Sequence, residues 1–193
     1  MAKRRQEGDV IDLLEYEDRL LVQLLDLFGD PAAGIEEHEE TARLVVEHLS
    51  IRENARAELA TVLEKAEVGE RAQQILRSDQ SDLRRELAYL DEITKASPPE
   101  EVMRQELDEA VAPVEAILRA EIPDELTTVI PAAKQSRDWL EANAGLPSAA
   151  RVAKRAKSRR KRARIAEALT GVSALEVISD EEEAERRDHP AAY

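Results

Sequence analysis

Apolar residues recur at alternating steps of three and four in four stretches of this 193-residue chain. Such spacing places the apolar side chains on one stripe of an α-helix, and that stripe has to be buried. Breaks rich in Gly and Pro separate the stretches, and such residues end helices. The predicted helical segments cover residues 9–28, 36–66, 70–95 and 100–142. Because the connections are short, we predict an all-α fold, an antiparallel up-down four-helix bundle.

Residues near the ends of these segments refine the prediction. Asp9 and Ser97 are of the types that cap helix N-termini, so we expect helices to begin after them. Pro113, Pro123 and Pro131 each lack a backbone donor. The last segment is therefore predicted to be kinked.

Polar residues interrupt the apolar stripe of every predicted helix near its middle. A charged group that is buried without a partner costs several kcal/mol. These residues must therefore satisfy one another, bind a ligand or face water. The interrupting residues are Asp18, His48, Arg52, Gln80, Glu121 and Glu125. The sequence thus predicts a polar pocket in the core of the bundle.

Four motifs around these positions carry a family resemblance. Residues 9–19 are similar to the pattern Leu-Leu-x-x-Asp-His-Arg, and residues 48–53 to His-x-x-x-Glu-Glu. Residues 78–84 stand where the pattern has Glu-His or Asp-His. Residues 121–131 stand where it has His-x-x-x-Glu followed by Leu-Phe-Pro. In this order the motifs resemble the hemerythrin-like (HHE cation-binding) domain family, over about residues 9–135.

The resemblance implies an up-down bundle, which in the family holds a non-haem di-iron centre. Only His48 and Glu125 keep the ligand types of the family. The four departures are Asp18 for His, Arg52 for Glu, Gln80 for His and Glu121 for His. We assign no residue to a further ligand that the family has on its second helix. We therefore expect the fold of the family with a degenerate metal pocket.

Arg52 is the most informative departure. A guanidinium cannot ligate a cation and stays charged at physiological pH. Our hypothesis is that Arg52 replaces the charge of the metal and bridges Asp18, Glu121 and Glu125. Two alternatives remain open. Asp18, His48, Glu121 and Glu125 form an atypical single iron or manganese site with Arg52 turned outward, or the polar residues lie on solvated faces.

The charge of the chain is unevenly distributed. Its net charge is −14, with −17 on residues 1–150 and +3 on residues 151–193. An acidic body argues against general nucleic-acid binding by that body. The chain has no cysteine, which excludes disulfides, thiolate metal sites and a cysteine nucleophile. It has no apolar run that suits a membrane span or a signal peptide, so we predict a cytoplasmic protein. Its frequent Ala, Arg and Glu residues favour a bacterial source.

A basic run occupies residues 151–164. Three interpretations compete: a solvated helix that folds back on the acidic bundle, a weak contact to nucleic-acid phosphates, or a contact to anionic lipid headgroups. The candidate residues for binding a polyanion are Arg155, Arg159, Arg160, Lys161 and Arg162. A gel-shift series against salt separates the second interpretation from the others.

We therefore expect a flexible N-terminus (1–8), a hemerythrin-like bundle (9–145), a basic helical extension (146–179) and a disordered acidic tail (180–193). The chain has no Gly-rich phosphate loop and no nucleophile motif, so we do not expect an enzyme. The leading functional hypothesis is a non-enzymatic binding or scaffold module without a cofactor, acting on a protein partner that the sequence does not identify. The alternatives are a metal sensor or store that binds iron or manganese, and a nucleic-acid-associated regulator acting through residues 151–164.

Overall fold

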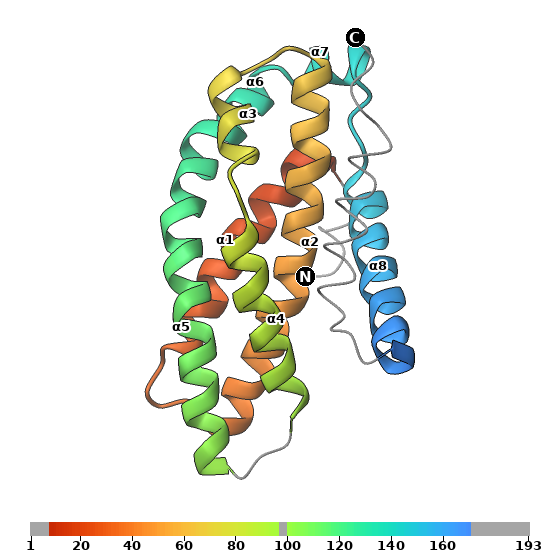
Figure 1. Cartoon of the computed structure of the whole chain (residues 1–193). Helices are drawn as coiled ribbons and strands as arrows, with labels where there is room; N and C mark the ends of the chain where they lie inside the picture. Colours follow the sequence, from red (N-terminus) through yellow and green to blue (C-terminus); the bar gives the residue numbers. More distant parts are fainter. Residues whose placement is uncertain (1–7, 97–99, 171–193) are drawn as a thin grey trace.

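The computed structural model describes residues 8–96 and 100–170, and this part of the chain is helical apart from its turns and one isolated bridge. Four long helices run along the long axis of the molecule (Figure 1). They are α1 (Val10–Phe28), α2 (Ile35–Lys65), α4 (Ser81–Lys95) and α5 (Glu100–Asp124). Helix α2 packs against each of the other three, and α1 and α4 both pack against α5.

Shorter helices gather at one end of this arrangement, at the top of Figure 1. They are α3 (Glu70–Leu76), the π-helix η1 (Glu125–Val129), α6 (Ile130–Gln135) and α7 (Arg137–Asn143). The last helix, α8 (Ala149–Thr170), packs along the flank of α2. None of the helices in the described ranges has the length and hydropathy of a membrane-spanning segment.

The boundaries agree with the sequence at the first helix and differ at the third. Asp9 caps α1, because its side chain accepts bonds from the backbone amides of Ile11 at 2.8 Å and Asp12 at 3.2 Å. The predicted segment 70–95 is instead two helices, α3 and α4, with a turn between them. The Asp79 carboxylate accepts the Ser81 amide at 2.9 Å in this turn. Such a local bond competes with the helix ladder and explains the break.

The predicted segment 100–142 is also divided, into α5, η1, α6 and α7. Helix α5 continues through Pro113 and Pro123, and the helix type first changes at Glu125. Pro131 lies in the first turn of α6, where a missing amide donor leaves no helix bond unmade. The predicted cap Ser97 lies outside the described residues, as do residues 1–7 and 171–193.

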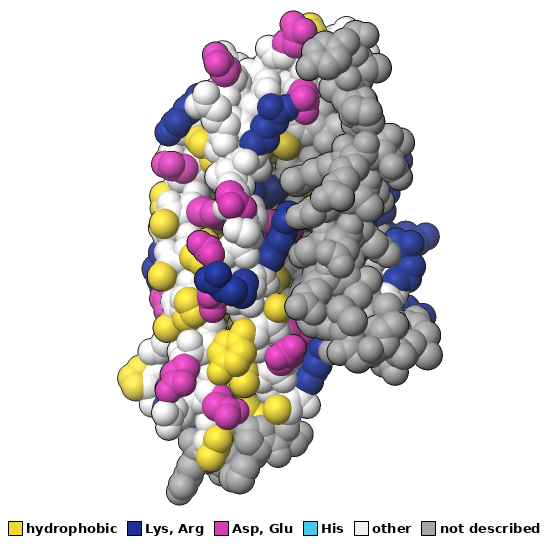
Figure 2. All heavy atoms as spheres, in the orientation of Figure 1, with side chains coloured by type: hydrophobic (Ala, Val, Ile, Leu, Met, Phe, Trp, Pro, Cys, Tyr) yellow, Lys and Arg dark blue, Asp and Glu magenta, His cyan; other side chains and the backbone are white. Residues whose placement is uncertain are grey.

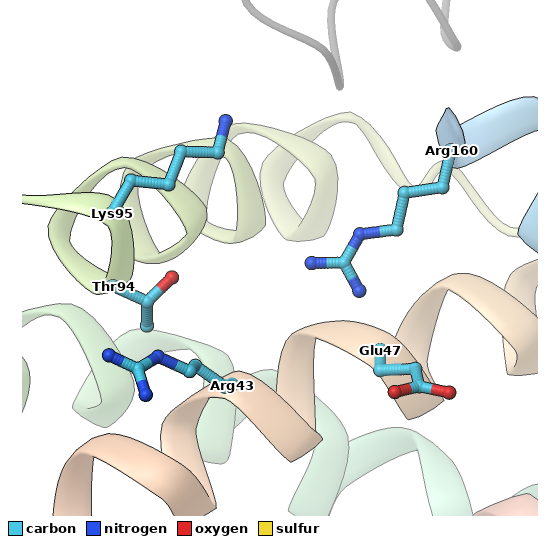
Figure 3. A pocket seen from close by; sticks show the side chains of 5 residues that line it. All are labelled: Arg43, Glu47, Thr94, Lys95 and Arg160. Atoms are coloured by element: carbon cyan, nitrogen blue, oxygen red, sulfur yellow. The ribbon is translucent and has the colours of Figure 1, made fainter. Parts of the chain in front are cut away.

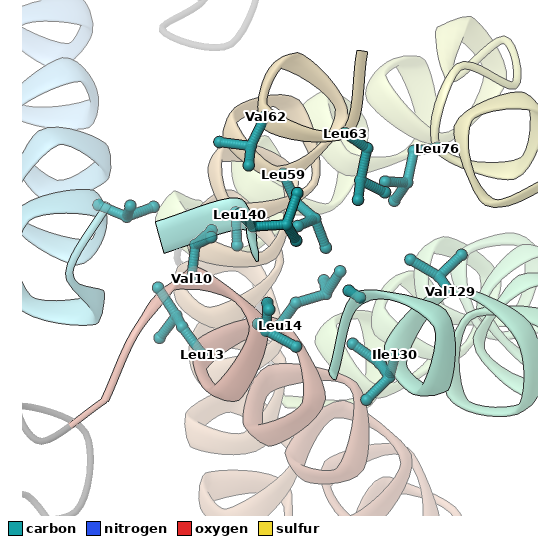
Figure 4. Close-up of a cluster of buried hydrophobic side chains, with 14 of the residues drawn as sticks. Val10, Leu13, Leu14, Leu59, Val62, Leu63, Leu76, Val129, Ile130 and Leu140 are labelled. Carbon is teal, nitrogen blue, oxygen red and sulfur yellow. The ribbon is translucent and has the colours of Figure 1, made fainter. Parts of the chain in front are cut away.

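The buried apolar side chains form two clusters with a polar layer between them. One cluster includes Leu14, Leu59, Val129 and Leu140 (Figure 4). The other includes Leu21, Leu49, Leu87 and Leu118. Along α1, Leu14 belongs to the first cluster and Leu21 to the second, and the buried Glu17 and Asp18 lie between them. The polar layer therefore crosses the middle of the core.

Helix α8 is part of the same core. Val152 and Ala156 are buried in the first apolar cluster. The chain entering α8 also bonds to the start of α1, because the Val10 amide donates to the Pro147 carbonyl at 2.9 Å and the Ala149 amide to the Gly8 carbonyl at 3.0 Å. The basic helical extension expected over 146–179 is a packed helix from residue 149 to residue 170, preceded by a non-helical segment at 146–148, and residues 171–179 lie outside the described residues.

Candidate functional site

Arg52 lies at the centre of the polar layer with its side chain fully buried. Its Nε donates to Asp18 Oδ1 at 2.8 Å, and its Nη2 donates to Glu125 Oε1 at 2.8 Å and to Glu121 Oε2 at 3.4 Å. Its Nη1 donates to Glu53 Oε1 at 3.1 Å. The guanidinium therefore joins α1, α2 and the end of α5, and it contacts all three carboxylates that the sequence placed around it.

Arg56 supplies a second buried cation one turn further along α2. Its Nη1 lies 2.7 Å from Glu125 Oε1 and 2.9 Å from Glu121 Oε2. Its Nη2 donates to the Ile75 carbonyl at 3.1 Å and to the Ser78 hydroxyl at 3.2 Å. Arg56 thus ties the turn between α3 and α4 to the same carboxylates that bind Arg52.

Gln80 connects this turn to α5. Its Nε2 donates to Glu121 Oε1 at 2.8 Å, and its Oε1 accepts from Arg56 Nη1 at 3.3 Å. Glu121 keeps about a fifth of its side chain exposed, whereas Glu125 has none exposed. We call this set the ionic layer: Asp18, Arg52, Arg56, Gln80, Glu121 and Glu125. It contains two cations and three carboxylates.

His48 is held by a partner that the sequence did not single out. Its Nδ1 lies 2.6 Å from Oε2 of Glu17, a fully buried carboxylate on α1. Glu17 precedes Asp18 in α1, so adjacent residues of α1 bind different residues of α2: Glu17 binds His48 and Asp18 binds Arg52. His48 is thereby directed to Glu17, one turn along α2 from Arg52.

The side chains do not fit the metal centre that the resemblance implies. In the described ranges, no three His, Asp or Glu side chains converge as a metal-binding group. Arg52 lies between Asp18 and Glu125 with bonds to both, where it would repel a metal ion. The alternative set of Asp18, His48, Glu121 and Glu125 is therefore not assembled, because Arg52 points inward and His48 pairs with Glu17.

The backbone changes its winding at the ionic layer. The π-helix η1 begins at Glu125, two residues after Pro123. Single π-turns in α-helices are rare and are frequent at functional sites. The Thr127 hydroxyl donates to the Pro123 carbonyl at 2.6 Å, which satisfies a backbone acceptor at this transition. The wider turn carries Glu125 into the core beside both arginines.

Burial shifts the protonation of the layer. It raises the pKa of Glu125 to about 8, with help from the charge of Asp18 and against the opposing effect of Arg52 and Arg56. Burial also raises the pKa of Asp18, and Arg52 opposes it. For Arg52, burial lowers the pKa, but the charges of Glu125 and Asp18 outweigh it and the net shift is upward. Arg52 therefore stays charged, and Glu125 favours its protonated form at neutral pH.

The position of that proton follows from two unsatisfied atoms. Within the described residues, Asp18 Oδ2 and Glu125 Oε2 are buried without a hydrogen-bond partner. A proton on Glu125 leaves Arg52 and Arg56 facing the carboxylates of Asp18, Glu121 and Glu53, and so reduces the excess of negative charge. The neutral carboxyl also supplies a donor for the carboxylate of Asp18, whose charge raises the pKa of Glu125. We infer that Glu125 is the protonated member of the layer.

Stability is expected to fall as pH rises because of this proton. The unfolded chain releases the Glu125 proton near its ordinary pKa of 4.5, and the folded chain near 8. Between these values the folded state binds more protons, so its free energy of unfolding decreases with pH, by up to about 1.4 kcal/mol per unit. Urea titrations from pH 5 to 8 measure this slope. Glu125→Gln cannot ionise and should lose it, and parallel pH profiles for the two proteins would contradict the assignment.

A second polar feature lies where α8 meets α2 and α4. Arg160 of α8 donates to Asp91 at 2.9 Å, and Lys95 of α4 lies 2.8 Å from the other oxygen of that carboxylate. The cleft beside them has a volume of about 530 Å³ (Figure 3). It is lined by Arg43, Glu47, Thr94, Lys95 and Arg160. Its cations are paired with carboxylates, so the cleft is a junction between helices and not a preformed anion site.

The sequence missed several members of this chemistry, Arg56 and Glu17 among them. Arg56 was not assigned to the inward stripe, although His48, Arg52 and Arg56 recur every four residues along α2. That spacing places them on one face and was a usable signal. Glu17 carried no such signal, because its neighbour Asp18 already occupied the expected stripe position.

No family model, curated protein sequence or solved structure in the comparisons matches this chain.

Proposed function

We propose that this chain is a hemerythrin-like domain in which an internal pair of arginines replaces the metal centre, and that it serves as a non-enzymatic binding or scaffold module. The observation that carries the proposal is the guanidinium of Arg52. It lies between Asp18 and Glu125 and bonds to both at 2.8 Å. A cation is required among buried carboxylates, and Arg52 supplies one covalently attached to the chain.

The arrangement of the long helices supports the same proposal. We assign α1, α2, α4 and α5 to an up-down four-helix bundle, the fold that the family resemblance implies. Neighbouring helices in the chain pack together, α1 with α2 and α4 with α5. A layer of facing polar side chains at mid-length is where bundle proteins build metal sites. In this chain the polar groups of that layer bind one another.

The proposal accounts for the lack of an open coordination position. Catalytic metal sites keep one position free for water or substrate. Here the donors of Arg52 and Arg56 are directed at protein acceptors on α1, α3, α5 and η1. A site that is filled by its own side chains stabilises the fold and offers little to a substrate. The cytoplasmic location and the bacterial source remain predictions.

The proposal predicts that the chain folds without bound metal and that added metal does not change its melting temperature. Protein purified without chelators should contain less than one equivalent of iron or manganese by elemental analysis. Its melting temperature should not change on adding Fe(II) or Mn(II), whereas a bound ligand at a hundred times its Kd would add about 2.7 kcal/mol of stability. EDTA-treated protein serves as the control. Stoichiometric metal, or near-ultraviolet absorption typical of an oxo-bridged di-iron site, would contradict the proposal and favour the metal-sensor alternative.

A further inference from the structure

Helix α8 has two faces of different character. Its apolar residues Val152 and Ala156 are buried against the rest of the molecule. Several of its cations pair with acidic residues of α2 and α4: Arg155 with Glu58, Lys157 with Glu47 and Arg160 with Asp91. Arg159 donates to Asn54 Oδ1 at 3.1 Å. These contacts agree with the interpretation in which the basic run folds back on the acidic body.

The opposite face of α8 carries cations that are exposed to solvent. Arg151, Lys154, Lys161 and Arg162 are exposed, and none of them has an acidic partner in the part of the chain that the structure describes. We call these four residues the outer cationic stripe. At 100° per residue they fall within about 100° of the helix circumference, opposite Val152 and Ala156. Figure 2 shows dark-blue Lys and Arg side chains gathered at the edge where α8 lies.

The length of the stripe suits a regularly charged polyanion. Arg151 and Arg162 are eleven residues apart, which corresponds to about 16 Å along the helix axis. One strand of a nucleic-acid duplex presents a phosphate about every 3.4 Å along its axis. The stripe therefore spans about five successive phosphates. Ser158, which is also exposed on this face, adds a hydroxyl donor between the two pairs of cations.

The chemistry of the stripe distinguishes among polyanions. A helix that inserts into a lipid surface buries an apolar face in the bilayer, but the apolar face of α8 is already buried in the protein. Binding to single strands relies on aromatic side chains that stack on bases, and α8 contains none. Contacts to the phosphate backbone of a duplex need neither an apolar face nor aromatic side chains, and Lys, Arg and Ser side chains supply them.

We propose that the outer cationic stripe of α8 binds the phosphate backbone of duplex nucleic acid without regard to sequence. The site is separate from the ionic layer, so a failure of either proposal leaves the other intact. The cations that pair with Glu47, Glu58 and Asp91 hold the helix on the body, and the outer stripe contacts the ligand. The acidic body limits the contact to this one edge.

The test is a titration of a labelled, mixed-sequence DNA duplex with the full chain, followed by fluorescence anisotropy. Binding is expected at about 50 mM salt, and the logarithm of the association constant should fall with that of salt with a slope of about −3 to −4 for four phosphate contacts. Raising the salt fourfold should therefore weaken binding about a hundredfold. Replacing all four stripe residues by Gln should lower the association constant at least about tenfold at low salt.

A matched variant separates the stripe from net charge. Lys65→Gln, Arg71→Gln, Arg85→Gln and Arg104→Gln together remove the same charge from exposed positions outside α8. This variant should bind the duplex within about threefold of the unmodified chain. Circular dichroism shows whether both variants stay folded. Absence of duplex binding, equal losses in the two variants, tighter binding to single strands, or binding only to anionic phospholipid vesicles would each overturn the proposal.

Discussion

Replacing Arg52 by alanine is expected to lower the free energy of unfolding by about 3–5 kcal/mol. The substitution removes the cation but leaves Asp18 and Glu125 fully buried. Asp18 then lacks the charge that compensates it, and both carboxyls lack their donors at 2.8 Å. Urea-induced unfolding followed by circular dichroism measures the loss. It is expected to exceed the effect of any single substitution at an exposed arginine.

Two further variants test whether the loss comes from the ionic layer. Arg85→Ala removes an exposed arginine that pairs with Glu86 at the surface, and it should change stability by less than about 0.5 kcal/mol. The triple variant Asp18→Asn, Arg52→Met, Glu125→Gln removes the charges together and should recover much of the loss. An Arg52→Ala protein with near-native stability would show that the layer is not buried as described.

Replacing Arg56 by alanine is expected to lower the free energy of unfolding by about 2–4 kcal/mol. The loss is smaller than for Arg52 because Glu121 is partly exposed and water can solvate it. Arg56 also holds the turn between α3 and α4 through the Ile75 carbonyl and the Ser78 hydroxyl. Backbone amides of residues 75–81 should therefore exchange faster with solvent, beyond the change expected from global stability alone.

Arg56→Lys is the matched control for this prediction. It keeps the positive charge near Glu121 and Glu125 but cannot reach the turn with a second planar donor group. It should retain more stability than Arg56→Ala while still allowing faster exchange in residues 75–81. If exchange in this turn is unchanged in both variants, Arg56 does not anchor it.

The two predictions together define what the ionic layer does. Arg52 balances buried charge, whereas Arg56 balances charge and also connects α2 to the turn that places Gln80 against Glu121. The pH dependence assigned to Glu125 arises first from its burial in this layer, and the charge of Asp18 adds to it. A layer with these properties fixes how the helices are rotated relative to one another, because each bond requires one orientation of each helix.

The helical class of the fold and the position of the polar layer were readable from the sequence. The spacing of apolar residues marked the inward stripe of each helix, and Asp18, Arg52 and Glu125 interrupted it. Since buried charges must be paired, a single arginine among inward carboxylates already indicated its partners. This part of the site depends on periodicity along one helix and on charge balance, and both are properties of the sequence.

The pairing of His48 with Glu17, the role of Arg56 and the turn before Gln80 were decided by the tertiary structure. Periodicity gives the angular position of a residue on its own helix, but not how far each helix is rotated and shifted against its neighbours. Glu17 and Asp18 are adjacent in the chain, and the rotation of α1 against α2 determines which of them meets His48 and which meets Arg52. Partner choice in this core is therefore set by helix packing, which no single segment encodes.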